Sequence, residues 1–200
     1  GSDARGIRPE SAADGGNTRL MPFTAEELDT HLDHVAAAPS DIGIVELIVA
    51  RPAVGERRIL EAGELRPGVG LVGDNYLERG SSRIPGGPAD PLAELNIMSA
   101  RAIEAVAGVD RERWQLAGDQ FIVDFDLSVD TAPAGTRLRI GTAVIEVTAK
   151  PHNGCAKFAE RFGVDAARWV NSRNDLRLRG ICAVVVEPGA VTVGDEIRPM

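Results

Sequence analysis

The sequence predicts a mostly β fold (α+β) in which the strands form a closed or nearly closed β-barrel with a few peripheral helices. Five to seven short apolar segments, rich in β-branched residues, are separated by turns that contain glycine or proline. Strands and helices do not alternate regularly, which disfavours a doubly wound parallel sheet. Since 44% of the 200 residues are hydrophobic, the chain can build a full domain core.

Composition also predicts the domain organisation of the chain and its location in the cell. Residues 1–20 are rich in Gly, Ala, Asp and Ser, and we expect a disordered tail that begins with a cloning scar, Gly1-Ser2. One domain is expected over 21–200. The net charge of −8 is spread along the chain and argues against a nucleic-acid surface. No apolar run reaches the roughly 20 residues of a membrane span. No signal peptide is visible, and two cysteines require no disulfide, so a reducing cytoplasm is the expected location.

The first elements follow from capping and periodicity. Thr24 and Glu27 have the spacing of a capping box and predict an amphipathic helix over 24–37. The dense Ile and Val content of 41–51 predicts a long buried strand. Glycines and prolines divide 52–73 into strand fragments and turns. The following stretch, 78–91, is expected to be a long loop of the kind that often carries function.

The middle of the chain predicts one helix and three strands. Residues 96–107 have helical spacing and end at Gly108, a C′ glycine. Residues 121–125 alternate as a strand. The apolar phase then shifts by one residue between 136–140 and 143–149, which would turn over every side chain of a continuous strand. A two-residue turn at Gly141-Thr142 resolves this shift and predicts a hairpin.

The last third predicts two helices and a strand pair. Residues 155, 158, 159 and 162 form one apolar helical stripe that ends at Gly163. A second short helix is expected over 165–171, with Asp165 as its N-cap. Residues 181–186 form an unbroken β-branched strand, and 191–197 close the chain.

Cys155 is the candidate functional residue from chemistry alone. It follows the proline-glycine break of Pro151–Gly154 and precedes a predicted helix, where backbone N–H groups and the macrodipole favour a thiolate. His152 and Lys157 add positive charge or a hydrogen bond, and Gly154 leaves room for a ligand. These features indicate an accessible sulfur that ligates a soft metal or carries sulfur.

The alternative is a structural cysteine. Cys155 shares the apolar stripe of Phe158 and Phe162, and free cysteine is among the most buried residue types. Spacing alone favours that alternative. Cys182, inside the predicted strand at 181–186, is expected to be core packing.

The region 70–197 resembles the MOSC domain, the module named after the C-terminal part of molybdenum-cofactor sulfurase. The resemblance rests on the order and spacing of short pieces over more than half of the chain. These pieces are Val72–Asp74, Ala117–Asp119, Val123–Ser128, Ala134–Gly141, Ala143–Thr148, Pro151–Cys155, Arg179-Gly180 and Val193–Glu196.

The resemblance implies a barrel of the MOSC type, a single-domain bacterial-type member and a molybdenum cofactor (molybdopterin). The characteristic cysteine of the family falls at Cys155, as the metal ligand and the catalytic residue. The implied cofactor-binding residues are Cys155, His152, Asn153, Gly154, Lys157, Arg79, Arg83 and Arg179, with the arginines expected to pair with the pterin phosphate. The pyridoxal-phosphate domain of the sulfurase is absent from this sequence.

The resemblance also suggests an oxidoreductase that acts on small N-hydroxylated substrates with an external electron donor, because the chain has no flavin, iron–sulfur or nicotinamide motif. Two departures favour cofactor association over a particular reaction. Residues 83–88 lack the histidine that related proteins carry beside two glycines, and Asp119-Gln120 stands where many members have Glu-Asn. Two alternatives stay open: a carrier that hands cofactor or sulfur to a partner protein, and a scaffold in which Cys155 is only core.

Overall fold

The computed structural model describes residues 23–81 and 84–200, so the expected tail at 1–20 and Arg83 lie outside the described residues. The helices are α1 (Ala25–Asp29), α2 (Leu32–Ala36), α3 (Tyr76–Arg79), α4 (Ala100–Ala107), α5 (Arg111–Trp114), α6 (Ala156–Phe162) and α7 (Val164–Val170), with a 3-10 turn at Gln115–Ala117. The strands are β1 (Gly43–Ala50), β2 (Arg58–Leu60), β3 (Ala62–Arg66), β4 (Gly70–Leu71), β5 (Leu95–Ser99), β6 (Phe121–Asp124), β7 (Arg137–Ile140), β8 (Ala143–Val147), β9 (Ile181–Glu187), β10 (Gly189–Thr192) and β11 (Glu196–Pro199).

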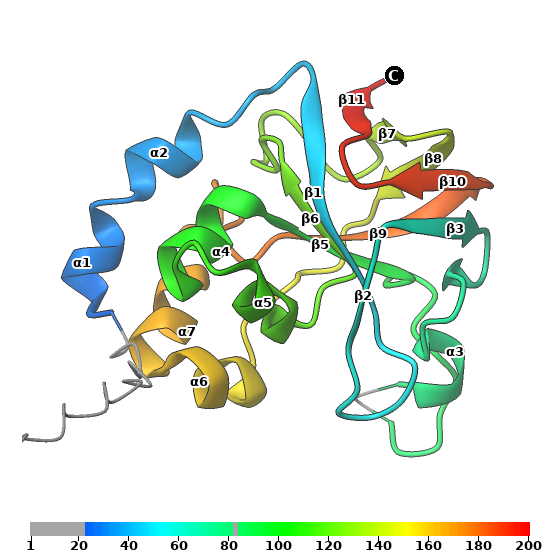
Figure 1. Cartoon of the computed structure of the whole chain (residues 1–200), viewed down its shortest axis with the longest axis horizontal. Coiled ribbons are helices and arrows are strands. Elements are labelled where there is room, and N and C mark those ends of the chain that lie inside the picture. Colours follow the sequence, from blue (N-terminus) through cyan, green and yellow to red (C-terminus); the bar gives the residue numbers. More distant parts are fainter. Residues whose placement is uncertain (1–22, 82–83) are drawn as a thin grey trace, which may run out of the picture.

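Seven strands close into a barrel in the order β11-β7-β8-β9-β5-β6-β1, which confirms the predicted fold class (Figure 1). Closure comes from β1 and β11, which pair through Gly43 with Ile197 and Ile44 with Glu196. β5 and β6 run parallel, and the other neighbouring barrel strands are antiparallel. β2 extends the sheet beyond β1, while β10, β3 and β4 form a second, small sheet.

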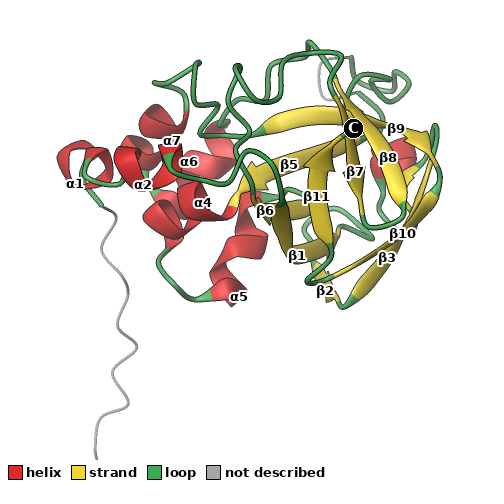
Figure 2. Cartoon of the chain, turned by 90° about the horizontal axis from the view of Figure 1, so that it is seen from above, coloured by secondary structure: helices red, strands yellow, loops and turns green. Residues whose placement is uncertain are grey.

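Two hydrophobic clusters hold the fold together. One fills the barrel and includes Phe121, Phe125 and Ile145, all fully buried. The other lies between the barrel wall and the helices, and it includes Ile103 and Trp169. Figure 2 shows α1, α2, α4, α5, α6 and α7 gathered on one side of the barrel. These six helices therefore cover one flank of the barrel, and α3 lies apart from them (Figure 1).

The predicted helix over 96–107 is wrong in its first part, which is strand β5. Along β5, Ile97 belongs to the barrel cluster and Met98 to the helix-side cluster. A strand buried on both faces reads as a continuous apolar run, and periodicity alone does not separate such a run from a buried helix. The helix begins only at Ala100 and ends at Gly108 as predicted.

Two further expectations about helices are corrected. The capping box at Thr24 is present, but the single helix expected over 24–37 is divided into α1 and α2. At the division, the Thr30 hydroxyl donates a 2.6 Å hydrogen bond to the carbonyl of Glu27, an alternative that competes with helix continuation. Asp165 is not the N-cap of α7. Gly163 takes that position, and Asp165 lies in the first turn.

The predicted hairpin is confirmed. β7 and β8 are antiparallel with Ile140 opposite Ala143, so Gly141 and Thr142 form the two-residue connection. Gly141 has a φ of 55°, a conformation that glycine adopts without steric cost. β8 leads directly into the segment that contains Cys155, so the hairpin fixes where that segment starts.

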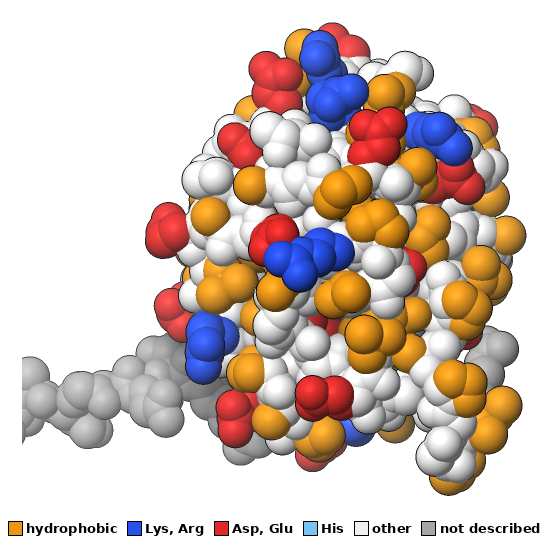
Figure 3. Space-filling view, turned by 90° about the vertical axis from the view of Figure 1, so that its right-hand side faces the viewer, with side chains coloured by type: hydrophobic (Ala, Val, Ile, Leu, Met, Phe, Trp, Pro, Cys, Tyr) orange, Lys and Arg blue, Asp and Glu red, His pale blue; other side chains and the backbone are white. Residues whose placement is uncertain are grey.

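Two further observations concern the distribution of charge on the surface and the length of the helices. Figure 3 shows a face on which acidic and basic side chains are interspersed among apolar ones. Within residues 23–81 and 84–200, no helix is long and apolar enough to cross a membrane.

Candidate functional site

Cys155 lies at the junction between an extended segment and α6. Its backbone is extended (φ −107°, ψ 179°), and its carbonyl accepts hydrogen bonds from the N–H groups of Phe158 and Ala159 at 2.9 and 3.1 Å. Cys155 is therefore the N-cap residue of α6, as its position before the helix predicted. Its side chain makes no capping hydrogen bond and is exposed to solvent. The apolar stripe buries Phe158 and Phe162 but not Cys155, so the thiol is accessible.

Cys182 has the opposite environment. It is 2% exposed within β9, and burial is the main cause that raises the pKa of its thiol to about 11. Its Sγ lies 3.5 Å from Oδ1 of Asn96. Cys182 is therefore core packing, as predicted, and Cys155 is the cysteine with access to a ligand.

A buried network holds the segment before Cys155. Nε2 of His152 lies 2.7 Å from Oδ1 of Asp119, and Nη1 of Arg179 lies 2.6 Å from Oδ2 of the same carboxylate. Arg179 also donates to the carbonyl of Ala117 at 3.0 Å and stacks over the ring of Phe158, 5.0 Å from the ring centroid. Asp119 thus connects the start of β6, the His152 segment and, through Arg179, helix α6.

In this network Asp119 is ionised and His152 is neutral near neutral pH. Burial alone would raise the pKa of Asp119, but Arg179 and His152 outweigh burial and lower the pKa to about 2. Burial lowers the pKa of His152, and the positive charge of Arg179 lowers it further, against the opposing effect of Asp119. His152 is therefore neutral when folded near neutral pH. With a carboxylate facing Nε2, that nitrogen carries the proton.

This network predicts a loss of stability in acid. Because the folded pKa of His152 lies below its ordinary value of 6.5, the unfolded chain takes up more protons as the pH falls below 6.5. The free energy of unfolding should therefore decrease over that range. Asp119 adds a second decrease, of the order of 2 kcal/mol, as the pH falls from 3.8 towards about 2.

Urea unfolding of the wild type and His152→Gln, between about pH 7.5 and about pH 5, measures the histidine contribution. Glutamine keeps a donor for Asp119 and does not titrate. The wild type should lose more stability towards acid than the variant. Parallel stability profiles would show that His152 does not titrate as the structure implies.

A cluster of arginines surrounds Gly118, the residue before Asp119. Arg51 donates from Nη1 to the Gly118 carbonyl at 2.9 Å and is itself paired with Asp74, with Nη2 to Oδ2 at 2.7 Å. A methyl group placed on Gly118 would lie 3.7 Å from Nη1 of Arg161 and 3.8 Å from Nη2 of Arg57. Gly118 itself has a φ of 88°. Glycine adopts this left-handed conformation without steric cost, and it lets the chain turn between Arg57, Arg161 and Arg51.

Positive charge in this arginine cluster exceeds what nearby carboxylates balance. Within the described chain, neither Arg57 nor Arg161 has a carboxylate within ion-pairing distance. Burial lowers the pKa of Arg57, and the charges of Arg161 and Arg51 lower it further. Nε of Arg57 is buried without a hydrogen-bond partner among the described residues. Repelling guanidinium groups of this kind are stabilised by a bound anion.

The other predicted site residues fall in different places. Arg79, at the end of α3, is exposed, but desolvation and then the charges of Arg51 and Arg57 lower its pKa, so it lies within electrostatic reach of the arginine cluster. Lys157 is exposed on α6. Arg83 lies outside the described residues.

Two predicted site residues have structural roles in the folded chain. Gly154 faces α7 rather than an open ligand path, because a methyl group there would lie 2.9 Å from Cγ2 of Val170. Its N–H and carbonyl both bond the side chain of Asn171, at 2.8 and 3.1 Å. Arg179 has Asp119 as its partner. Gly154 and Arg179 therefore position the segment around Cys155.

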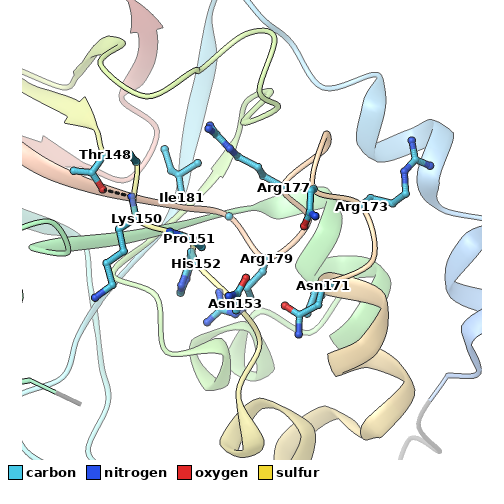
Figure 4. A pocket seen from close by; sticks show the side chains of 14 residues that line it. Thr148, Lys150, Pro151, His152, Asn153, Asn171, Arg173, Arg177, Arg179 and Ile181 are labelled. Carbon is cyan, nitrogen blue, oxygen red and sulfur yellow. Dashed lines mark hydrogen bonds between the residues drawn. The ribbon is translucent and has the colours of Figure 1, made fainter. Parts of the chain in front are cut away.

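A pocket of about 430 Å³ lies beside this segment (Figure 4). His152, Asn153 and Arg179 line it, but Cys155 and Lys157 do not. The structure therefore places His152, Asn153 and Arg179 at this pocket, and Arg79 within electrostatic reach of the arginine cluster near Gly118. No contact places Cys155 or Lys157 in either region of the described chain.

Sequence reasoning missed Asp119, Arg51, Arg57 and Arg161 as parts of the site. Asp119 had a signal, because Asp119-Gln120 departs from the Glu-Asn of related proteins. The arginines had none, since they come from separate parts of the chain and meet only at Gly118.

The chain combines a closed barrel, an exposed N-cap cysteine and an arginine cluster in which Arg57 and Arg161 have no carboxylate partner among the described residues. A family model described as "MOSC domain" matches residues 81–198, more than half of the sequence, and the chain belongs to this family. The family is associated with molybdenum-cofactor binding. None of the curated proteins matches the sequence.

Solved structures agree with the fold. The chain is similar to the YuaD protein from Bacillus subtilis, with a TM-score of 0.54 and 20% identity over 78% of this chain and 94% of that chain. It is also similar to YiiM from Escherichia coli, with a TM-score of 0.51 and 19% identity over 78% of this chain and 69% of that chain. At these identities the similarity establishes the barrel architecture alone.

Proposed function

We propose that this chain binds a molybdenum cofactor, with the Cys155 thiolate as a ligand of the metal, and reduces small N-hydroxylated compounds with electrons from a partner protein. The observation that carries the proposal is the exposed thiol of Cys155 at the start of α6, in a member of the MOSC domain family. Thiolate is a soft ligand suited to such a metal, and an exposed thiol can be reached by both cofactor and substrate.

The residues present fit the cofactor. A molybdopterin carries a phosphate, and the arginine cluster around Gly118 offers guanidinium groups of Arg57 and Arg161 that have no carboxylate partner in the described chain. Arg161 is on α6, the same helix that Cys155 caps. One helix thus carries both the thiol and a cation for the phosphate. When bound, the cofactor would supply the redox chemistry that no side chain of this protein provides.

His152, Gly154 and Asn171 would hold the segment around Cys155 in place rather than react. His152 keeps its proton on Nε2, facing Asp119, so it holds the segment before Cys155 in place and is not set to deliver a proton. The paired hydrogen bonds between Gly154 and Asn171 fix the residue next to Cys155 against α7. A preorganised thiol loses little freedom when it binds the metal.

Metal analysis and a turnover assay test the proposal together. Purified from a host that makes the cofactor, the protein should contain stoichiometric molybdenum. With a chemical reductant such as reduced methyl viologen, the loaded protein should reduce benzamidoxime to benzamidine, while protein from a host without the cofactor should not. Absence of molybdenum from protein made in the cofactor-producing host would contradict the proposal.

A carrier without turnover is the second candidate function. The observation that favours it is the exposure of Cys155, which suits handover of a cofactor or a sulfur atom to a partner protein. In that case the protein would retain molybdenum but show no reduction of benzamidoxime. Transfer of molybdenum from the loaded protein to an apoenzyme in a mixing experiment would then identify the carrier.

A further inference from the structure

The pocket beside His152 has a lining that contains cations and amides but no carboxylate. It lies where the segment after β8 meets the loop between α7 and β9, and Figure 4 shows the labelled side chains coming from these two segments and from the start of β9. The lining residues are Thr148, Ala149, Lys150, Pro151, His152, Asn153, Val170, Asn171, Arg173, Asn174, Arg177, Arg179, Gly180 and Ile181. In a protein with a net charge of −8, a lining that has four cationic side chains and no acidic one indicates a place for an anion.

Three of the four cations already have carboxylate partners outside the lining. Lys150 pairs with Asp90, Arg173 pairs with Asp175 at 2.7 Å, and Arg179 pairs with Asp119. Arg177 differs, because within the described chain it forms no ion pair and donates from Nη1 to the carbonyl of Ala132. Arg177 therefore contributes the positive charge in this pocket that the protein itself does not balance.

Backbone strain marks the same residue. Among the described residues other than glycine, Arg177 has the one positive φ, 47°. This conformation costs free energy for a side chain of that size, and residues strained in this way cluster at active sites, ligand clamps and switch regions. The Arg177 side chain is half-buried, and this burial lowers the pKa of its guanidinium. A strained, half-buried cation without a counter-ion is best explained by a ligand that pairs with it.

Unused hydrogen-bond donors lie around the same space. Nε of Arg179 is buried without a partner among the described residues, although Arg179 lines the pocket. The exposed side-chain amides of Asn153 and Asn174 also line the pocket, where a bound anion can accept hydrogen bonds from them in place of water. The volume of about 430 Å³ is within the range of small-molecule pockets.

We propose that this pocket binds a small organic anion through its carboxylate or phosphate group, with Arg177 as the cation that pairs with it. The planar guanidinium fork matches either oxyanion. The site is separate from the arginine cluster, because none of Cys155, Arg51, Arg57 and Arg161 lines the pocket. The inference does not depend on molybdenum binding, since it is tested on protein without cofactor.

A titration followed by ¹⁵N NMR tests the proposal on the full chain. Sodium phosphate and sodium malonate are added separately, each against sodium chloride at equal ionic strength. Saturable shifts are expected at the amides of Asn153, Asn174 and Gly180, and the probe that binds more tightly identifies the preferred oxyanion. Absence of saturable shifts with both probes, or shifts that instead centre on Gly118, would overturn the proposal.

Two variants and a control assign the site to Arg177. Arg177→Asn removes the charge and suits the positive φ, so binding should weaken by about 10-fold or more. Arg177→Lys keeps the positive charge but lacks the planar guanidinium group, and it should bind the anion with intermediate affinity. This variant provides a second measurement if Arg177→Asn folds poorly. Arg137→Gln removes an exposed arginine of β7 that pairs with Glu146, and it should bind like the wild type. Equal affinity in all four proteins would also overturn the assignment.

Discussion

Replacement of Cys155 by alanine is expected to abolish molybdenum retention in protein purified from a cofactor-producing host. The thiolate is the metal ligand that the chain supplies in our proposal, and alanine offers no donor atom. Since Cys155 is exposed and makes no capping hydrogen bond, the substitution should leave the fold and its stability nearly unchanged. Inductively coupled plasma mass spectrometry measures the metal, and urea unfolding confirms the intact fold.

Cys182→Ala is the matched control for this prediction. Cys182 is buried in β9, so its replacement should cost about 1 kcal/mol of stability through the small cavity but leave the molybdenum content at the wild-type level. Retention of stoichiometric molybdenum in Cys155→Ala would remove the metal-ligand role from Cys155. Loss in both variants would point to a general folding effect.

Asp119→Ala is expected to cost about 3–5 kcal/mol of unfolding free energy, the largest stability effect among the side chains of the site. Asp119 is fully buried and is the partner of both Arg179 and His152. Its removal leaves the Arg179 guanidinium buried without a counter-charge, and a buried unpaired charge is strongly unfavourable. Urea unfolding at neutral pH gives the change in free energy.

Asp124→Ala is the corresponding control. Asp124 also pairs with an arginine, Arg101 at 2.7 Å, but both side chains of that pair are partly exposed. Partly exposed pairs contribute about 1 kcal/mol or less. If the two alanine variants lose similar amounts of stability, Asp119 is not the buried hub that the geometry describes.

Local signals predicted most of the barrel strands. The β-branched runs at 41–51 and 181–186 became β1 and β9, and the phase shift at Gly141-Thr142 became the β7–β8 hairpin. Such features depend on neighbours in the sequence, where alternation and turn residues act directly. β5 was mistaken for helix because its two faces pack against different clusters, which local periodicity does not report.

Of the candidate site, the sequence by itself determined that Cys155 begins a helix after a proline-glycine break, and resemblance added the family. The tertiary structure decided that the thiol is exposed and that Asp119 pairs with both His152 and Arg179, which lie 33 and 60 residues further along the chain. It also decided which arginines meet at Gly118. The reason is physical: burial and charge pairing depend on which distant segments the closed barrel brings together, and no local pattern encodes those distances.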